Sequence, residues 1–434
     1  MTEKRGNRLL ALLAVLTLLI AACGGTGGEE GTTTSVAEEA TTTAGEEAET
    51  TTSAAGASTT AAAGAECPHE NNSVFLFAPY EENQPAGVNW RAGIEHAVAD
   101  INNEGGILGC TVEVQFEGTQ GDPDIGRQVV AEGVELDPYA ILGTVFSSVT
   151  IVNMVEAQNA EIPQFVGAEA PDITNREVNG DNNFIFRTSF GGDNAAPKLV
   201  EFMLEEGVQK VDIIYKNDEF GAGGAGAHRD AMEAAGIEIG EEILVQPDQL
   251  DQSGEVAQLI ASDSDSVFVY MTEIETGAFL DERTAQGLEK PLYGGDVLTS
   301  PASLELAQPG AGDGAKSHSN LAAGADVFAD WRTAHEEFHP GIEGVDHNNI
   351  KGYMSVHYVK EMTERLGGFD RLALADQLHC ATITVDDEPG VLLDVTFDGN
   401  GDLDRESFIL EVVDGVGVVA ASAPPLDNLS ERGC

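Results

Sequence analysis

The segment from residue 93 to residue 109 reads GIEHAVADINNEGGILG and decides the fold. Apolar residues recur at helical spacing into and through this segment, which predicts a helix over 87–103. An apolar run at 73–78 precedes the helix, and an alternating stretch at 111–117 follows it. A strand, a helix and a second strand in this order form the unit of a parallel α/β sheet.

The same alternation of strand and helix continues along the chain. Further strands are predicted at 139–143, 163–167, 211–215, 237–245, 266–270, 292–294, 391–397 and 408–413. Further helices are predicted at 122–136, 148–159, 193–206, 222–235, 254–261, 275–286, 325–338 and 347–366. These are too many units for one sheet of ordinary size, so we expect an α/β fold of two lobes with parallel sheets.

The chain is strongly acidic. Its 434 residues include 75 acidic and 21 basic side chains, which give a formal net charge of -54. The phosphates of nucleic acids and the headgroups of anionic lipids are repelled by such a surface, so we expect neither as an electrostatic partner. A hydrophobic content of 42% is sufficient for packed cores.

The first 23 residues have the features of a bacterial export signal. Basic residues precede an apolar run at 9–20, which is shorter than the about 20 residues that span a bilayer. The sequence then resembles a lipobox, which makes 1–22 a signal peptide and Cys23 a lipid-modified N-terminus. The alternative is an ordinary signal peptide with a chance cysteine. Residues 24–66 are almost all Gly, Thr, Ala, Ser and Glu, which predicts a disordered tether on the extracytoplasmic face of the membrane.

Four further cysteines indicate disulfide bonds in an oxidising compartment. Cys67, Cys110, Cys380 and Cys434 allow three pairings. Cys67 and Cys110 each precede one of the first two predicted strands, which would be neighbours in a parallel sheet. We therefore favour Cys67–Cys110 and Cys380–Cys434, and the second bond would hold the C-terminal tail.

Short motifs follow the opening segment in a fixed order. They are Gly121-Asp-Pro123, Gly143 with Ser147, Ala170-Pro-Asp-Ile-Thr174, Phe186-Arg-Thr188, Asp218-Glu-Phe-Gly221 and Val395-Thr-Phe-Asp-Gly-Asn-Gly-Asp402. Together the motifs resemble the branched-chain amino-acid-binding (Leu/Ile/Val-binding) protein family over residues 73–416. Members of that family are the extracytoplasmic receptors of ABC importers.

The resemblance implies a periplasmic-binding-protein-like fold. Two Rossmann-like lobes would be joined by three crossovers, near Thr188, Leu321 and Glu388. The first lobe would comprise 67–188 and 322–388, and the second lobe would comprise 189–321 and 389–434. Ligand would bind in the cleft between the lobes, where strands end and helices begin.

On the first lobe, the resemblance implies that Ser147 and Ser148 receive the ligand. The hydroxyl and backbone of Ser147 would bind a carboxylate, and Gly167 and Glu169 would form the next turn of the site. Without the resemblance, the spacing favours Ser147 as a simple helix N-cap.

On the second lobe, Phe220 would pack on the ligand and Asp296 would pair with its ammonium group. Without the resemblance, Phe220 reads as a core residue and Asp296 as a turn carboxylate. Tyr80 is a further expected contact, in a loop longer than the family's.

Glu169 departs from the family pattern, which often has Thr or Ser there. A carboxylate at this position would repel the carboxylate of an amino acid. Either Glu169 points away from the cleft, or the ligand is cationic or lacks a carboxylate, as an amine or amide does.

One motif matches a zinc enzyme. His335-Glu-Glu-Phe-His339 fits the HExxH signature, with Glu336 as base and Glu361 or Glu364 as third ligand. Pro340 and Gly341 end the helix directly afterwards, so we expect no metal site and no enzyme here.

Two glycine-containing motifs also match known sites. Gly221-Ala-Gly-Gly-Ala-Gly226 fits GxGxxG but begins six residues beyond its strand, so we expect close helix packing and no cofactor. The stretch 398–404 resembles the start of a calcium loop, but Leu403 replaces the required glycine. A hairpin turn is expected there.

The sequence therefore predicts a monomeric, lipid-anchored receptor. It would bind a small polar solute (an amino acid, amide or amine) and deliver it to the permease subunits of an ABC importer. The alternative from another class is a sensing module, which would signal through a kinase or cyclase.

The excess of acidic residues predicts that the free energy of unfolding rises in molar salt, because salt screens repulsion among the carboxylates. Urea unfolding at 0.1 M and 2 M NaCl measures this change. A free energy of unfolding that falls as salt is added would contradict the prediction, and no change would favour an acidic protein without salt adaptation.

Overall fold

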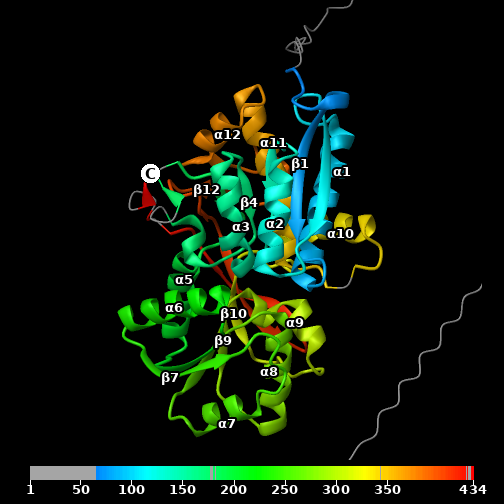
Figure 1. The fold of residues 1–434 in the computed structure, drawn as a ribbon. Coiled ribbons are helices and arrows are strands. Elements are labelled where there is room, and N and C mark those ends of the chain that lie inside the picture. Colours follow the sequence, from blue (N-terminus) through cyan, green and yellow to red (C-terminus); the bar gives the residue numbers. More distant parts are fainter. Residues whose placement is uncertain (1–64, 176–178, 181, 343, 427, 429–431) are drawn as a thin grey trace, which may run out of the picture. The chain divides into compact units, whose positions relative to one another are not determined.

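The computed structural model describes residues 65–175, 179, 180, 182–342, 344–426, 428 and 432–434. The predicted signal peptide, Cys23 and the tether at 24–64 lie outside these residues. Residues 61–434 form one compact unit, whose fold is shown in Figure 1. None of the helices in the described part of the chain has the length and apolar character needed to cross a membrane.

The first lobe is built on a five-stranded sheet in which all strands are parallel. Its order is β2-β1-β3-β4-β5. The strands are β1 (Ser73–Tyr80), β2 (Thr111–Gly118), β3 (Ala140–Leu142), β4 (Gln164–Val166) and β5 (Ile185–Arg187). The helices of this lobe are α1 (Pro85–Glu104), α2 (Pro123–Val134), α3 (Ser147–Asn159), α10 (Ala329–Phe338), α11 (His347–Leu366) and α12 (Arg371–Leu378).

Helices cover both faces of this sheet because successive strand residues point to opposite sides. Phe77 on β1 packs in one core with residues of α2 and α3. Its neighbour Leu76 packs in the other core, with residues of α1 and α11.

The second lobe is built on a seven-stranded mixed sheet of order β15-β14-β10-β9-β8-β6-β7. Its strands are β6 (Lys210–Lys216), β7 (Glu238–Val245), β8 (Ser266–Tyr270), β9 (Leu292–Gly294), β10 (Lys316–Ser319), β14 (Ser407–Val413) and β15 (Val416–Ala423). Its helices are α5 (Gly192–Glu205), α6 (Glu219–Ala234), α7 (Ser253–Ala261), α8 (Glu273–Gln286) and α9 (Pro301–Leu306). The strands from β6 to β10 are parallel, whereas β14 and β15 form an antiparallel hairpin at the edge.

The prediction of an α/β fold with two parallel sheets is confirmed. The sequence pattern missed the strands β5, β10 and β15, the short strands β11 (Thr382–Ile383) and β13 (Leu403–Asp404), and the helices α9 and α12. Polar residues explain the case of β10, which reads Lys-Ser-His-Ser and has no apolar pattern. Its last three residues are nevertheless buried between β9 and β14.

A small antiparallel sheet corrects the expected lobe boundary at Glu388. It consists of β11 (Thr382–Ile383), β12 (Val395–Phe397) and β13 (Leu403–Asp404). A boundary at Glu388 would cut through this sheet, whose apolar residues belong to the same core as α1 and α11. We therefore place the third crossover between β13 and β14.

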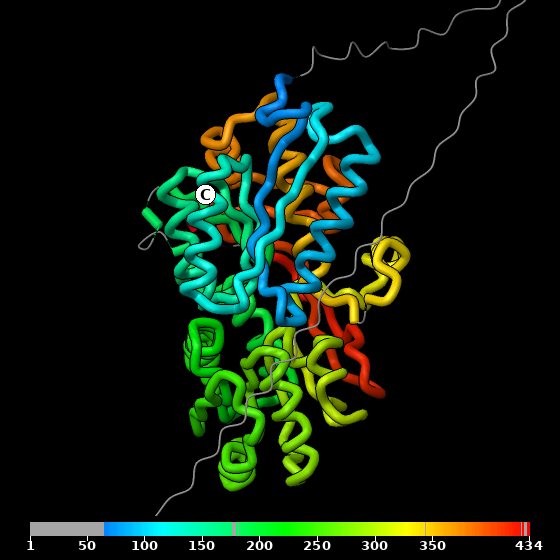
Figure 2. Tube along the Cα trace, turned by 45° about the vertical axis from the view of Figure 1, so that its right-hand side comes forward, coloured from blue at the N-terminus to red at the C-terminus, as the bar shows by residue number. Residues whose placement is uncertain are grey.

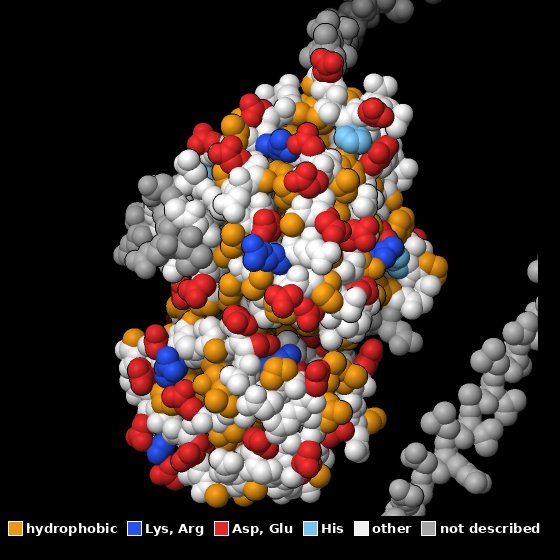
Figure 3. Space-filling model, in the orientation of Figure 1, with side chains coloured by type: hydrophobic (Ala, Val, Ile, Leu, Met, Phe, Trp, Pro, Cys, Tyr) orange, Lys and Arg blue, Asp and Glu red, His pale blue; other side chains and the backbone are white. Residues whose placement is uncertain are grey.

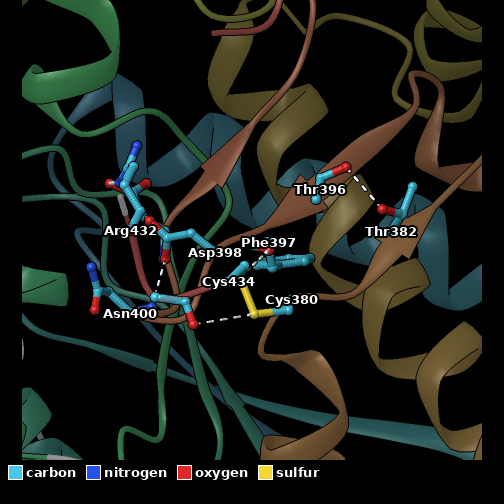
Figure 4. The surroundings of a disulfide bond; sticks show 10 residues. Cys380, Thr382, Thr396, Phe397, Asp398, Asn400, Arg432 and Cys434 are labelled. Carbon is cyan, nitrogen blue, oxygen red and sulfur yellow. Dashed lines mark hydrogen bonds and ion pairs between the residues drawn. A yellow bond between two sulfur atoms is a disulfide. The ribbon is translucent and has the colours of Figure 1, made fainter. Parts of the chain in front are cut away.

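Two disulfides have the pairing expected from the sequence. Cys67 bonds Cys110, and Cys380 bonds Cys434, each with 5.7 Å between the Cα atoms. The second bond holds the C-terminal residue beside β12, as Figure 4 shows. Arg432 reinforces this attachment through an ion pair of 2.7 Å with Asp398.

Glycines let α1 and α11 approach closely. A Cβ atom on Gly93 would lie 2.0 Å from the backbone oxygen of Asn349, and one on Gly352 would lie 2.2 Å from the backbone oxygen of Trp90. The contact matters for function, because α11 also carries residues of the cleft described below.

The change Gly93→Ala is therefore expected to lower the free energy of unfolding by about 1–3 kcal/mol, because the added methyl group forces the helices apart. A suitable control is Gly254→Ala in α7, where an added Cβ meets nothing within 4 Å. That change is expected to be neutral or stabilising by up to about 1 kcal/mol. Urea unfolding measures both, and equal effects of the two changes would contradict the packing argument.

Candidate functional site

A cleft lies where strands of both sheets end. Loops after β3 and β4 form one wall, loops after β6, β8 and β9 form the other, and the start of α11 completes it. The lining residues are Ala86, Val145, Phe146, Ser147, Ser148, Gly167, Glu169, Asp218, Phe220, Thr272, Glu273, Asp296, Val297, His347, Asn348 and Lys351. The cavity that they enclose has a volume of about 40 Å³. The carboxyl ends of parallel strands are where α/β folds bind ligands.

The first wall begins with the amino end of α3. Ser147 and Ser148 are its first two residues, and both line the cleft. The hydroxyl oxygen of Ser147 accepts hydrogen bonds from the backbone N–H groups of Glu169 (3.3 Å) and Ala170 (3.1 Å). Ser147 therefore fixes the neighbouring turn and is not the N-cap of α3, which is Phe146.

Two buried side chains, those of Trp90 and Arg187, support the turn from 167 to 170. Gly167 lies over the ring of Trp90, where a Cβ atom would come within 3.1 Å of a ring carbon. Arg187 is fully buried and donates to the backbone oxygens of Ala168 (2.6 Å) and Ala170 (3.1 Å). The Phe-Arg-Thr motif thus has a physical role, which is to position this turn.

The Glu169 side chain is nearly buried and its carboxylate has four donors. One oxygen accepts from Ser189 (2.6 Å), Asn320 (3.0 Å) and Lys351 (2.8 Å). The other accepts from the hydroxyl of Tyr270 (3.2 Å). The negative charge of Glu169 is therefore compensated by a lysine of the same protein, which the sequence did not reveal.

The second wall carries Phe220 and Asp218, both at the start of α6. Phe220 packs against Tyr270 with ring centroids 4.6 Å apart and lines the cleft. Asp218 caps α6 by accepting from the N–H of Gly221 (2.8 Å), and it lies 3.5 Å from the ammonium group of Lys216.

Asp296 and Glu273 complete the second wall. Asp296 accepts a hydrogen bond from Asn320 (2.9 Å) and lies 3.8 Å from the ammonium nitrogen of Lys351. Glu273 is the first residue of α8 and is 3% exposed. Burial raises the pKa of Glu273 to about 7, and the charges of Asp346 and Asp296 add to this effect.

The cleft thus brings together six of the seven residues predicted to bind ligand, namely Ser147, Ser148, Gly167, Glu169, Phe220 and Asp296. Tyr80 is the exception, because its side chain lies in a different surface groove. There its hydroxyl accepts a hydrogen bond from Arg91 (2.7 Å), and its ring lies beneath the same guanidinium.

Sequence reasoning missed other residues of the cleft, including Asp218, Glu273, His347, Asn348 and Lys351. Lys351 is one of few lysines in a strongly acidic chain, and it lies on a helix that the sequence predicts. These two facts are the signal in the sequence that could have identified Lys351 as a residue of the cleft. Burial, together with the charge of Lys351, lowers the pKa of His347 to about 4. The ring is therefore neutral at pH 7.

The HExxH stretch does not form a zinc site. His335 is buried and its two ring nitrogens face His96 and Asn349, each at 3.1 Å. His339 turns to the backbone oxygen of Ala92 (2.9 Å), and Glu336 is exposed. Both imidazoles therefore have structural partners.

The proposed third ligands lie elsewhere. Within the described part of the chain, the one group of acids, histidines or cysteines close enough to share a metal ion is Glu361, Glu364 and Glu388. Lys360 pairs with Glu364 (3.1 Å) and also with Glu388, so part of this charge is already compensated.

The GxGxxG stretch packs closely, as the sequence predicts, whereas the turn expected at 398–404 pairs β12 with β13 and not with the predicted strand at 408–413, which is β14 of the second sheet. Gly224 in α6 faces the ring of Tyr270, which leaves no room for a Cβ. The stretch 398–404 connects β12 to β13 in an antiparallel pair. Its acids Asp398 and Asp402 pair with Arg432 at 2.7 and 3.0 Å.

Comparison with known proteins gives consistent matches. A family model described as "Periplasmic binding protein" matches residues 79–416. The Leu/Ile/Val-binding protein BraC3 of Rhizobium johnstonii is 26% identical over 370 residues, which cover 81% of this chain and 94% of that protein. The Leu/Ile/Val-binding protein of Escherichia coli is 25% identical over 220 residues, which cover 50% of this chain and 58% of that protein.

Solved structures share the fold. The branched-chain amino acid transporter substrate-binding protein LivJ of Streptococcus pneumoniae, in complex with isoleucine, has a TM-score of 0.70 at 19% identity. That match covers 82% of this chain and 99% of LivJ. A solute-binding protein of an ABC transporter from R. palustris, in complex with benzoate, has a TM-score of 0.73 at 18% identity and covers 83% of this chain and 99% of that protein.

The raised pKa of Glu273 predicts a pH dependence of stability in the ligand-free protein. Between its ordinary value of 4.5 and about 7, the folded state keeps a proton that the unfolded state releases. The free energy of unfolding therefore falls as pH rises through this range, by about 3 kcal/mol for a shift of this size. We expect Glu273→Gln to remove this part of the slope.

Urea unfolding at pH 5 and pH 8 measures this dependence. The matched control is Glu289→Gln, which removes one charge from an exposed residue. Equal pH slopes for wild type and Glu273→Gln would contradict the prediction.

Proposed function

Because the chain belongs to the periplasmic binding protein family, we propose that it is the solute receptor of an ABC importer. It captures a small polar ligand in the cleft between its lobes and delivers that ligand to permease subunits. The proposed ligands are amino acids and related amines or amides.

One observation carries this proposal, namely that polar and aromatic side chains from both lobes line a single cleft. Ser147 and Ser148 stand at a helix start on the first wall, and Phe220 and Asp296 stand on the second. A ligand that contacts both walls stabilises the closed arrangement of the lobes relative to an open one. The permease subunits would then bind the closed, ligand-loaded form of the receptor.

The comparisons support the ligand class. The curated relatives are named for binding leucine, isoleucine and valine, and one structural neighbour holds isoleucine. Another neighbour holds benzoate, so the fold accommodates ligands without an amino group. In this chain, Asp296 favours a ligand with a hydrogen-bond-donating nitrogen.

The sequence supports an extracytoplasmic location. We propose that Cys23 carries a lipid anchor and that residues 24–66 let a monomeric receptor reach its permease from the membrane surface. The two disulfides are consistent with an oxidising compartment.

Thermal unfolding of the purified protein tests the proposal. The protein is first refolded from denaturant to remove bound solute, and amino acids, amides, amines and aromatic carboxylates are then added separately. A ligand at about 100 times its dissociation constant stabilises the folded state by about 2.7 kcal/mol, which raises the melting temperature visibly. A response to zinc alone, with none to any solute, would contradict the receptor and favour a zinc hydrolase built on the HExxH motif at 335–339.

The variant Phe220→Ala is expected to weaken binding of the active solute by about tenfold or more, since burying an aromatic ring contributes about 1.5–3 kcal/mol. Phe338→Ala is the matched control, because Phe338 is exposed on α10 and does not line the cleft. Calorimetry on both variants measures the effect, and unchanged affinity in Phe220→Ala would place the ligand elsewhere.

A pull-down from membranes distinguishes the importer from the sensing alternative. We expect the loaded receptor to retain permease subunits. Retention of a kinase or cyclase instead would favour a signalling module.

A further inference from the structure

Glu273 is a buried carboxylate without a visible partner. It is 3% exposed and lines the cleft. Among the hydrogen bonds and ion pairs of the described residues, none joins its side chain to another residue. Such a group carries a large desolvation penalty unless something compensates its charge. The cleft is the place from which a compensating group can come.

Asn348 gives a second, independent indication at the same cleft. It is the second residue of α11, is 1% exposed and lines the cleft. Within the described residues, neither the oxygen nor the nitrogen of its side-chain amide has a hydrogen-bond partner. Buried amides are nearly always hydrogen-bonded in proteins, so this pair of atoms is expected to bind a ligand.

The charges that line the cleft are unbalanced. Its described lining residues include four carboxylates, those of Glu169, Asp218, Glu273 and Asp296, but only one lysine, Lys351. Lys351 lies 2.8 Å from Glu169 and 3.8 Å from Asp296, so Glu169 takes most of its charge.

The remaining charges do not change this balance. Asp218 is paired with Lys216 outside the cleft. His347 is neutral at pH 7 because burial lowers its pKa to about 4. Above pH 7, where Glu273 loses its proton, negative charge therefore remains at Glu273 and Asp296, and an entering cation would compensate it.

The helix start where an anion would bind already has a carboxylate beside it. The side chain of Glu81 is fully buried and accepts hydrogen bonds from the N–H groups of Val145 (3.3 Å) and Phe146 (3.1 Å). These two residues directly precede α3 and line the cleft. Burial raises the pKa of Glu81 to about 7, so above that pH a ligand carboxylate at Ser147 would meet the negative charge of Glu81 beside the lysine-paired carboxylate of Glu169.

We propose that the solute is a small organic cation without a carboxylate, held through its N–H or other cationic group by Glu273 and Asp296. Asn348 adds an acceptor for a further N–H and a donor that suits an uncharged oxygen. Phe220 presents an aromatic face to the apolar part of the cation. This inference rests on the proposed function, because it names the ligand class of the same cleft.

Pairs of compounds that differ by one carboxylate test the inference on the unaltered protein. The pairs are isoamylamine and leucine, cadaverine and lysine, agmatine and arginine, and choline and glycine betaine. Calorimetry at pH 8 in molar salt is expected to show at least one cation that binds about 100-fold more tightly than its carboxylate-bearing partner, as expected when one buried charge repulsion is removed.

Variants locate the cation. Glu273→Gln and Asp296→Asn are each expected to weaken its binding by about tenfold or more, the loss typical of removing one charged hydrogen-bond partner. The control Glu289→Gln removes an exposed charge and is expected to leave affinity unchanged. Melting curves verify that each variant folds.

Three results would overturn the inference, and they differ in which proposal remains. If the amino acids bind as tightly as their amines or more tightly, the cation assignment is wrong and the solute receptor remains. If no amine, amide, amino acid or aromatic carboxylate binds, both proposals fail. Affinity for a cation that neither Glu273→Gln nor Asp296→Asn changes would also overturn the assignment of the site.

Discussion

The buried carboxylate of Glu169 joins the two lobes of the molecule. Lys351 reaches it from α11 of the first lobe, and Tyr270 reaches it from β8 of the second. Ser189 and Asn320 contact it from the segments that connect the two sheets. A buried charge is costly unless every partner is in place, so this carboxylate favours the arrangement in which all four donors converge. The walls of the cleft depend on that arrangement, because Asn320 also holds Asp296.

The acidic surface of the protein and the acidic residues of its cleft both favour a cationic solute. Figure 3 shows acidic side chains over both lobes on the visible face, with few basic ones between them. A surface of this sign attracts cations and raises their concentration at the mouth of the cleft, an effect that salt weakens. Inside the cleft, Glu273 and Asp296 continue the same preference where water is largely excluded. The acidic surface would then attract cationic solutes from a distance, and the carboxylates of the cleft would select for the same positive charge on contact.

Patterns in the local sequence correctly predicted the structural features that depend on residues close together in the chain. The helix expected at 347–366 is α11 with the same bounds, because its cap and its spacing are both local. Ser147, Gly167 and Asp296 were placed through a resemblance that follows the chain in order, and they do line the cleft. The sequence did not predict that Glu273 and Lys351 line the cleft, because their positions depend on packing between segments far apart in sequence. The prediction for Tyr80 is wrong for a different reason, because a hydrogen bond from Arg91 in the following helix holds the Tyr80 side chain in another groove.

The C-terminal tail changes how the lobes are connected. After β15 ends at Ala423 in the second sheet, the chain returns to the first lobe, where Leu426 contacts Asp404 and Cys434 bonds Cys380. Figure 2 shows the chain end among elements of the first lobe, away from the strands of the second. The two lobes are thus linked by four segments, the last of which is covalently closed. A joint with four attachments resists twisting more than one with three, so we expect the tail to restrict rotation of one lobe against the other.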